Sequence, residues 1–65
     1  RQDYSDLYEA LMGLTEEARL AVTLYYMEGY NIREIARMTR VTESAVKNRL
    51  ARARTKLKEE LSKEG

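Results

Sequence analysis

Two helix-start signals in close succession constrain the fold of this chain more than any other feature of its sequence. Asn31 can cap one helix, and Glu34 completes a capping box of the Asn-x-x-Glu kind. Thr42 can cap the next helix in the same way. Only residues 39–41 remain between the two helices, a turn short enough to hold them at a steep angle. The sequence therefore predicts a helix-turn-helix in this half of the chain.

Helices are also predicted for most of the remaining sequence. Thr15 can cap a helix that begins with acidic residues, and Gly13 and Gly29 stand where helices are expected to end. The chain contains no proline, and no stretch shows the alternation of a strand. We predict an all-α fold without a sheet, a small four-helix single domain over residues 1–65. Its helices are expected over about 3–12, 16–28, 32–38 and 43–61.

The first two helices differ in how much of their surface is apolar. The first has one stripe at the i, i+3, i+4, i+7 spacing of a buried face, made of Tyr4, Leu7, Tyr8 and Leu11. The second is apolar around an arc of roughly 220°, about twice what one contact needs. We therefore expect the second helix to be packed between neighbours or to meet a partner protein.

The last helix has an apolar seam on one side and a polar, cationic surface on the other. The seam consists of Val46, Leu50, Ala53, Leu57 and Leu61. The opposite face carries Ser44, Asn48, Ala51, Arg52 and Thr55, with Lys47 and Arg54 on one flank and Arg49 and Lys56 on the other. Small, amide and guanidinium groups between flanking cations are typical of a helix that enters the major groove of DNA. The tail beyond Leu57 is expected to fray.

The net charge of +1 conceals a strong asymmetry along the chain. Residues 1–30 carry two cations and six anions, whereas residues 31–65 carry ten cations and five anions. Between Arg37 and Lys58 there are eight cations, and Glu43 is the one anion. This density indicates a phosphate-binding surface, although a solvated helix face rich in Lys and Arg would show the same charges. The adjacent turn favours DNA binding.

Several residue types and motifs are missing, which narrows the classes of function. The chain has no cysteine for a disulfide or a thiolate site, and no histidine, the usual general base and zinc ligand. It shows no glycine-rich phosphate loop, no signal peptide and no apolar run of about 18 residues. We expect a soluble, cytoplasmic, non-enzymatic protein with no catalytic residue, metal or cofactor. Because the chain begins with Arg1 rather than Met, we expect it to be a piece of a longer protein.

Two motifs are the most specific in the chain: MEGY leading into IREIA, and SAVKNRLARARTKL. With the sequence around them, about residues 14–61, they resemble region 4 of bacterial sigma factors, most closely the extracytoplasmic-function group. The resemblance implies a winged-helix-like domain with a C-terminal helix-turn-helix that binds double-stranded promoter DNA at the −35 element. It also implies docking on the β flap of the RNA polymerase core and a possible anti-sigma partner.

The resemblance assigns roles to individual positions. The base-contacting positions are Lys47, Asn48, Ala51 and Arg52, while Arg49 and Arg54 match positions that hold phosphates or brace the helix. The polymerase-binding surface is expected at the apolar residues Leu7, Leu11, Ala21, Leu24 and Tyr25.

Two departures from the family pattern bear on DNA binding. Arg40 stands where the family commonly has glycine, so we expect either strain of order 1 kcal/mol or a slightly different turn. Tyr25 and Tyr26 stand where many relatives have charged residues, which weighs against a phosphate contact from the second helix.

Two other functions stay open alongside a sigma domain. A stand-alone helix-turn-helix regulator would bind an operator as a dimer through an additional helix, for which the tail offers little. A helical protein-interaction module would use the cationic helix to bind an acidic partner without DNA. Salt distinguishes these functions, because counterion release makes DNA affinity fall log-linearly with salt concentration. In isolation we expect a monomer.

Overall fold

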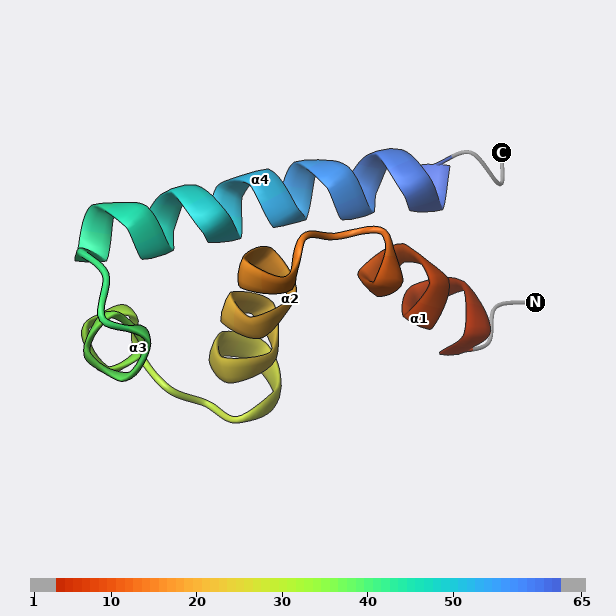
Figure 1. Cartoon of the computed structure of the whole chain (residues 1–65). Helices are drawn as coiled ribbons and strands as arrows, with labels where there is room; N and C mark the ends of the chain where they lie inside the picture. The colour runs from red at the N-terminus through yellow and green to blue at the C-terminus, as the bar shows by residue number, and fades with distance from the viewer. Residues whose placement is uncertain (1–3, 63–65) are drawn as a thin grey trace.

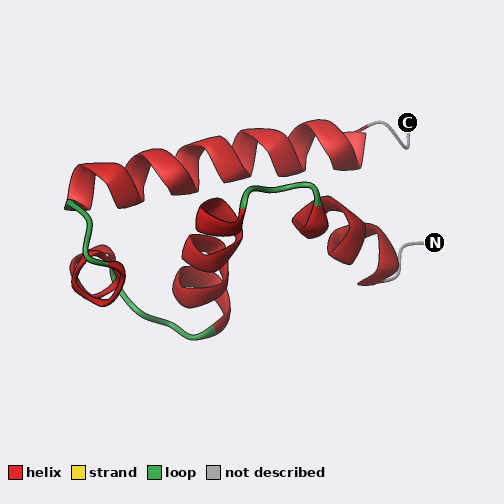
Figure 2. Cartoon of the chain, in the orientation of Figure 1, coloured by secondary structure: helices red, strands yellow, loops and turns green. Residues whose placement is uncertain are grey.

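The computed structural model describes residues 4–62, which consist of helices and their connections (Figure 1, Figure 2). The helices are α1 (Tyr4–Met12), α2 (Glu16–Val22), the π-helical segment η1 (Thr23–Met27), α3 (Ile32–Thr39) and α4 (Glu43–Ser62). No strand occurs within this described range. The predicted all-α class is confirmed, and so is the helix-turn-helix, which is formed by α3, α4 and the turn between them.

α4 is the element on which the other helices assemble. It packs against α1, α2 and α3, and Figure 1 shows these helices lined up along one side of it. α1 lies toward the C-terminal end of α4 and α3 toward its N-terminal end, with α2 crosswise between them. The principal extents of the chain are 38 × 18 × 15 Å, since α4 alone is about 30 Å long.

The core is apolar and lies between α4 and the helices beneath it. Its most buried large side chains are Ile35, Val46 and Leu50, which are at most 2% exposed. The predicted seam of α4 is confirmed, because Ala53 is also buried and Leu57 packs half-buried against the same cluster. The remaining members of the cluster are Leu11, Leu14, Ala18, Ala21, Val22 and Ala36. This seam fixes how α4 is rotated about its own axis.

All three predicted helix caps are present. Thr15 and Thr42 each accept a hydrogen bond through Oγ1 from the backbone N–H three residues on, at 3.1 and 3.0 Å. Asn31 Oδ1 accepts from the Glu34 N–H at 2.8 Å, and Glu34 Oε1 accepts from the Asn31 N–H at 2.8 Å. Each cap satisfies an N–H that has no partner within its helix, which stabilises the helix by about 1 kcal/mol. The helix starts therefore follow from local chemistry.

The buried stripe predicted for the first helix is wrong in part. Leu7 and Tyr8 are 37% and 61% exposed, whereas Ala10 and Leu11 are buried. α1 packs chiefly on α4, so it needs only one narrow buried face. The small Ala10 is buried, whereas Tyr8, which was expected to be buried, is exposed. Asp3 and the side chain of Tyr4, which belonged to the same prediction, lie outside the described residues.

The second helix is not α-helical throughout. From Thr23 to Met27 it widens into η1, where the Glu28 N–H donates to the Thr23 carbonyl at 3.0 Å. Gly29 then turns the chain with a positive φ of 83°, at the helix end where the sequence predicted it. The Tyr30 N–H donates to the Leu24 carbonyl at 2.9 Å. π-Helical turns are rare and occur often at functional sites, and the Tyr26 side chain of this one reaches Arg54 of α4.

Among the described residues the expected fraying after Leu57 does not occur, since α4 continues to Ser62. The rest of the tail, residues 63–65, lies outside the described residues. Lys56 and Glu60 form an i, i+4 ion pair at 3.9 Å, and the Ser62 hydroxyl donates to the Lys58 carbonyl. The ion pair favours the helical conformation in its last turns by a few tenths of a kcal/mol.

Candidate nucleic-acid interface

The outer face of α4 is turned away from the core. Val46, Leu50 and Ala53 hold the opposite face against α2 and α3, so the orientation of the outer face is set by buried packing. The predicted DNA-contacting residues that lie exposed on α4 are Ser44, Lys47, Asn48, Ala51, Arg52, Arg54 and Thr55, whereas Arg49 is half-buried. These seven side chains are therefore available to a ligand at the same time on one rigid helix.

One flank of α4 carries a contact that the sequence did not indicate. Arg54 Nη1 donates to the hydroxyl of Tyr26 at 3.3 Å, which joins α4 to η1. The ring of Tyr26 in turn packs edge-on against Tyr25, with centroids 4.9 Å apart and an interplanar angle of 83°. Arg54 is thereby braced, and the Tyr26 hydroxyl keeps its own proton for a further acceptor. Tyr26 and Arg54 are far apart in sequence, and no local motif links them.

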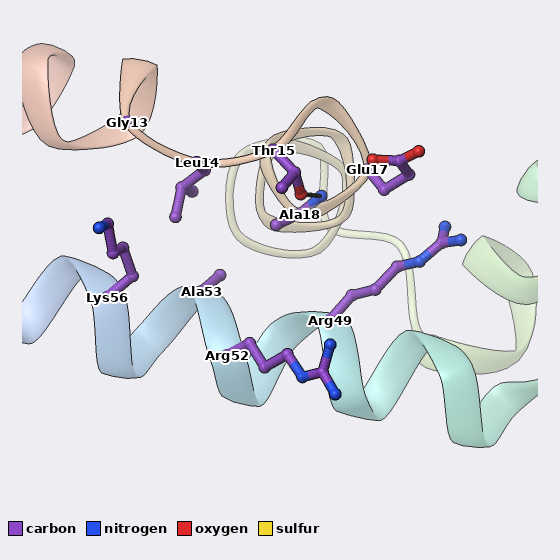
Figure 3. Close-up of a pocket in the computed structure, with 9 residues that line it drawn as sticks. All are labelled: Gly13, Leu14, Thr15, Glu17, Ala18, Arg49, Arg52, Ala53 and Lys56. Atoms are coloured by element: carbon purple, nitrogen blue, oxygen red, sulfur yellow. Dashed lines mark hydrogen bonds between the residues drawn. The ribbon is translucent and has the colours of Figure 1, made fainter.

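The other flank of α4 borders a groove of about 550 Å³ (Figure 3). Arg49, Arg52 and Lys56 line it on the α4 side, and the facing wall is formed by the connection from α1 to α2 and by the first turn of α2, which includes Glu17. In Figure 3, Lys56 extends from α4 toward that connection and Arg49 extends toward Glu17, whereas Arg52 lies along α4. Arg52 also lines a shallower hollow on the outer face, so it stands where the outer face meets this flank.

The α1–α2 connection is held in place by Arg19, another residue that sequence reasoning missed. Its Nη1 donates to the carbonyl oxygens of Leu11 at 3.4 Å and Leu14 at 3.2 Å. The Leu11 carbonyl lies in the last turn of α1 and also accepts from the Leu14 N–H at 3.1 Å, and the Leu14 carbonyl lies just beyond the end of α1. The only sequence signal was a cation on the helix that follows the connection, which is common on surfaces. Arg19 thus makes the wall of the groove a defined surface.

The turn before α4 ends α3 with a left-handed residue. Arg40 has φ 61° and ψ 43°, and its N–H faces the carbonyls of Ala36 and Arg37. The sequence predicted either backbone strain at Arg40 or a slightly different turn. The left-handed conformation of Arg40 corresponds to the first of these, a strained backbone. Beside the turn, Arg33 and Glu43 lie 3.8 Å apart with both side chains exposed, a pair worth less than about 1 kcal/mol.

The residues expected to bind polymerase are only partly available. Leu11 and Ala21 are 8% and 2% exposed and belong to the core, so their assignment to a partner surface is wrong. Leu24 is half-buried against the same core, while Leu7 and Tyr25 are exposed. On α2, buried and exposed residues differ because one side of its wide apolar arc packs into the core. The arc does continue onto the surface, at Leu20, Tyr26 and Met27.

Other kinds of site are not formed by the described part of the chain. Within residues 4–62 no cluster of three or more His, Cys, Asp or Glu side chains could hold a metal ion. None of the helices in that range is both long and apolar enough to cross a bilayer.

Comparison with known proteins agrees with the geometry of the helix-turn-helix. Residues 4–57 match the family described as sigma-70, region 4. The chain is also 52% identical over 48 residues to a protein named ECF RNA polymerase sigma factor SigM, in two strains of Mycobacterium tuberculosis. That match covers 74% of this chain but 24% of the relatives, so the chain spans about a quarter of their length. The chain therefore belongs to the region 4 family of sigma-70 factors and is of the extracytoplasmic-function type.

Proposed function

We propose that this chain is the domain of a sigma factor that recognises the −35 promoter element, and that α4 is its recognition helix. The observation that carries the proposal is the division of α4 into two sides. The buried part of its seam, Val46, Leu50 and Ala53, fixes its rotation, and the exposed side carries cationic, amide and small side chains together. This concentration of exposed cations on one side of a helix supports a nucleic-acid ligand.

Base recognition is assigned to the outer face. Arg52 can offer two donors to O6 and N7 of guanine, Asn48 can pair with adenine, and Lys47 can donate as a point charge. Small side chains let the backbone of α4 approach the groove, and these are Ser44, Ala51 and Thr55. Specificity in this proposal therefore depends on the N-terminal two-thirds of α4.

Phosphate binding is assigned to the two flanks. Arg54, braced by Tyr26, serves one DNA strand, and Arg49 and Lys56, which border the groove, serve the other. Tyr26 is neutral, but its hydroxyl can donate to a phosphate oxygen beside Arg54. The sequence weighed against a phosphate contact from the second helix. We nevertheless assign one to Tyr26, at the π-helical end of that helix.

Docking on the RNA polymerase core is assigned to the exposed apolar surface of α1, α2 and η1. Leu7, Leu20, Tyr25 and Met27 contribute to it, and an apolar helix such as the tip of the β flap fits a surface of this kind. An anti-sigma factor would compete for the same residues or for α4. Because the chain spans a quarter of its relatives' length, we propose that it is one domain of a longer cytoplasmic factor.

The test is DNA binding by the 65-residue chain as a function of salt. A duplex selected from a randomised pool and its scrambled counterpart are titrated at several salt concentrations. We expect dissociation constants of about 10⁻⁴ to 10⁻⁶ M, a preference for the selected duplex, and a log–log salt slope of about −2 or steeper. No measurable binding to either duplex at low salt would indicate a protein-interaction module. A tight dimer in sedimentation experiments would indicate a stand-alone regulator.

A further inference from the structure

Arg40 holds a backbone conformation that disfavours its own side chain. At φ 61° it is the one residue other than glycine with a positive φ within residues 4–62. In this region the Cβ atom of an L-residue crowds the following carbonyl, a clash that glycine avoids and asparagine tolerates better. The hydrogen bonds that close the turn come from the backbone, such as the Val41 N–H to the Ala36 carbonyl at 3.0 Å. Glycine would form them equally well.

Within the fold, no interaction of the Arg40 side chain offsets this strain. It is exposed, and its guanidinium takes part in no hydrogen bond or ion pair with the residues that the structure describes. The neighbouring anion, Glu43, lies instead beside Arg33 at 3.8 Å. A strained residue that persists without an internal contact points to a ligand outside the fold.

The position of Arg40 indicates which ligand. The turn leads directly into α4, and Ser44, the first residue of the outer face, follows within one helical turn. When the N-terminal end of a recognition helix lies in the major groove, the residues just before it lie beside the phosphates at the groove edge. A guanidinium on a rigid turn suits bidentate contact with a phosphate.

We propose that Arg40 is a phosphate-binding residue of the DNA interface, in addition to the cations of α4. This inference rests on the proposed DNA-binding function. The conformation of Arg40 lowers stability. In this proposal Arg40 is retained because the turn places its charge where α4 enters the groove. Its contribution is independent of base sequence, and it affects affinity and the salt dependence of binding.

Three substitutions separate charge from backbone strain. Arg40→Gly removes both, Arg40→Asn removes the charge while tolerating the conformation, and Arg40→Lys keeps both. At 0.1 M salt, we expect the Gly and Asn variants to bind selected and scrambled duplexes roughly 5–10-fold more weakly, with salt slopes smaller by about 0.9. Arg40→Lys should stay within about twofold of the original chain on both duplexes.

Thermal stability should change in the opposite direction to DNA affinity. Arg40→Gly should raise Tm by at least about 2 °C, because it relieves the strain, while Arg40→Lys should leave Tm unchanged. A variant that is more stable yet binds DNA more weakly supports the proposal, since general damage to the fold would lower both quantities.

Several results would overturn it. Unchanged affinity and salt slope in Arg40→Gly would show that the guanidinium meets no phosphate. A loss confined to the selected duplex would indicate a base contact instead, and an unchanged or lower Tm in Arg40→Gly would remove the argument from strain. Arg54→Ala distinguishes failure of this inference from failure of the function. If Arg54→Ala weakens binding and Arg40→Gly does not, DNA binding stands and only the role of Arg40 is refuted.

Discussion

Replacing Leu50 by alanine tests the packing on which the interface depends. Leu50 is 2% exposed and lies in the middle of the α4 seam, in one cluster with Val46, Ala53 and Ile35. Leu-to-Ala changes in cores reduce the free energy of unfolding by about 2–5 kcal/mol, more where the site cannot collapse around the cavity. The neighbours of Leu50 come from several helices, so we expect the upper part of this range, about 3–5 kcal/mol.

That loss is large for a chain of this size. At about 0.05–0.15 kcal/mol per residue, the whole domain has a free energy of unfolding of roughly 3–10 kcal/mol. Each kcal/mol corresponds to about 4–8 °C in Tm for a domain of 60–100 residues. Leu50→Ala should therefore lower Tm by at least about 12 °C, or leave the chain largely unfolded at room temperature.

Circular dichroism at the helix minimum, recorded during thermal and urea denaturation, measures the effect. The matched control is Leu20→Ala, the same substitution on the exposed side of α2, where Leu20 is 47% exposed and the loss should stay below about 1 kcal/mol. If Leu50→Ala melts within a few degrees of Leu20→Ala, α4 is rotated differently about its axis, and the assignment of its outer face to DNA fails with it.

Four further substitutions test separate parts of the interface and the fold. Arg52→Ala should weaken binding to the selected duplex by about 1–3 kcal/mol and flatten the preference at one base position, whereas Arg54→Ala should weaken both duplexes alike and reduce the salt slope by about one. Titrations of both duplexes at two salt concentrations measure this, and equal losses on both for Arg52→Ala would leave only a basic patch. Tyr26→Phe removes the acceptor of the Arg54 bond, so both duplexes should bind slightly more weakly with Tm nearly unchanged; selective loss on one duplex would contradict a phosphate role. Asn31→Ala removes one side of the capping box and should reduce stability by about 0.5–2 kcal/mol in urea denaturation, and no change would show that the box adds nothing.

The parts of the fold that could be predicted from sequence are those set by neighbouring residues. The caps at Thr15, Asn31 and Thr42 each depend on a side chain and an N–H three residues away, so the residue types alone reveal them. The seam through Val46 and Leu50 was equally clear, because the period of one long helix repeats several times. The same regularity identified the outer face of α4.

The parts that could not be predicted depend on contacts between distant segments. The pattern of α1 did not show that Ala10, rather than Tyr8, would meet α4, because periodicity marks apolar positions and not the closeness of a neighbour. The bond from Arg54 to Tyr26 joins two helices that meet only in the folded chain. The widening into η1 has no signature in the residues that form it. For Arg40, the sequence raised the question of strain, and only the backbone angle answered it.

The two sides of α4 have different tolerance for change over evolutionary time. Substitutions along its buried seam are limited by the volume between the helices, whereas residues of the outer face such as Asn48 and Ala51 are exposed and touch little of the fold. Surface substitutions of this kind alter stability by less than about 0.5 kcal/mol. In the proposed interface, target preference can therefore drift by single mutations while the scaffold is preserved, so duplicated copies of such a domain can diverge in DNA preference without passing through an unfolded intermediate.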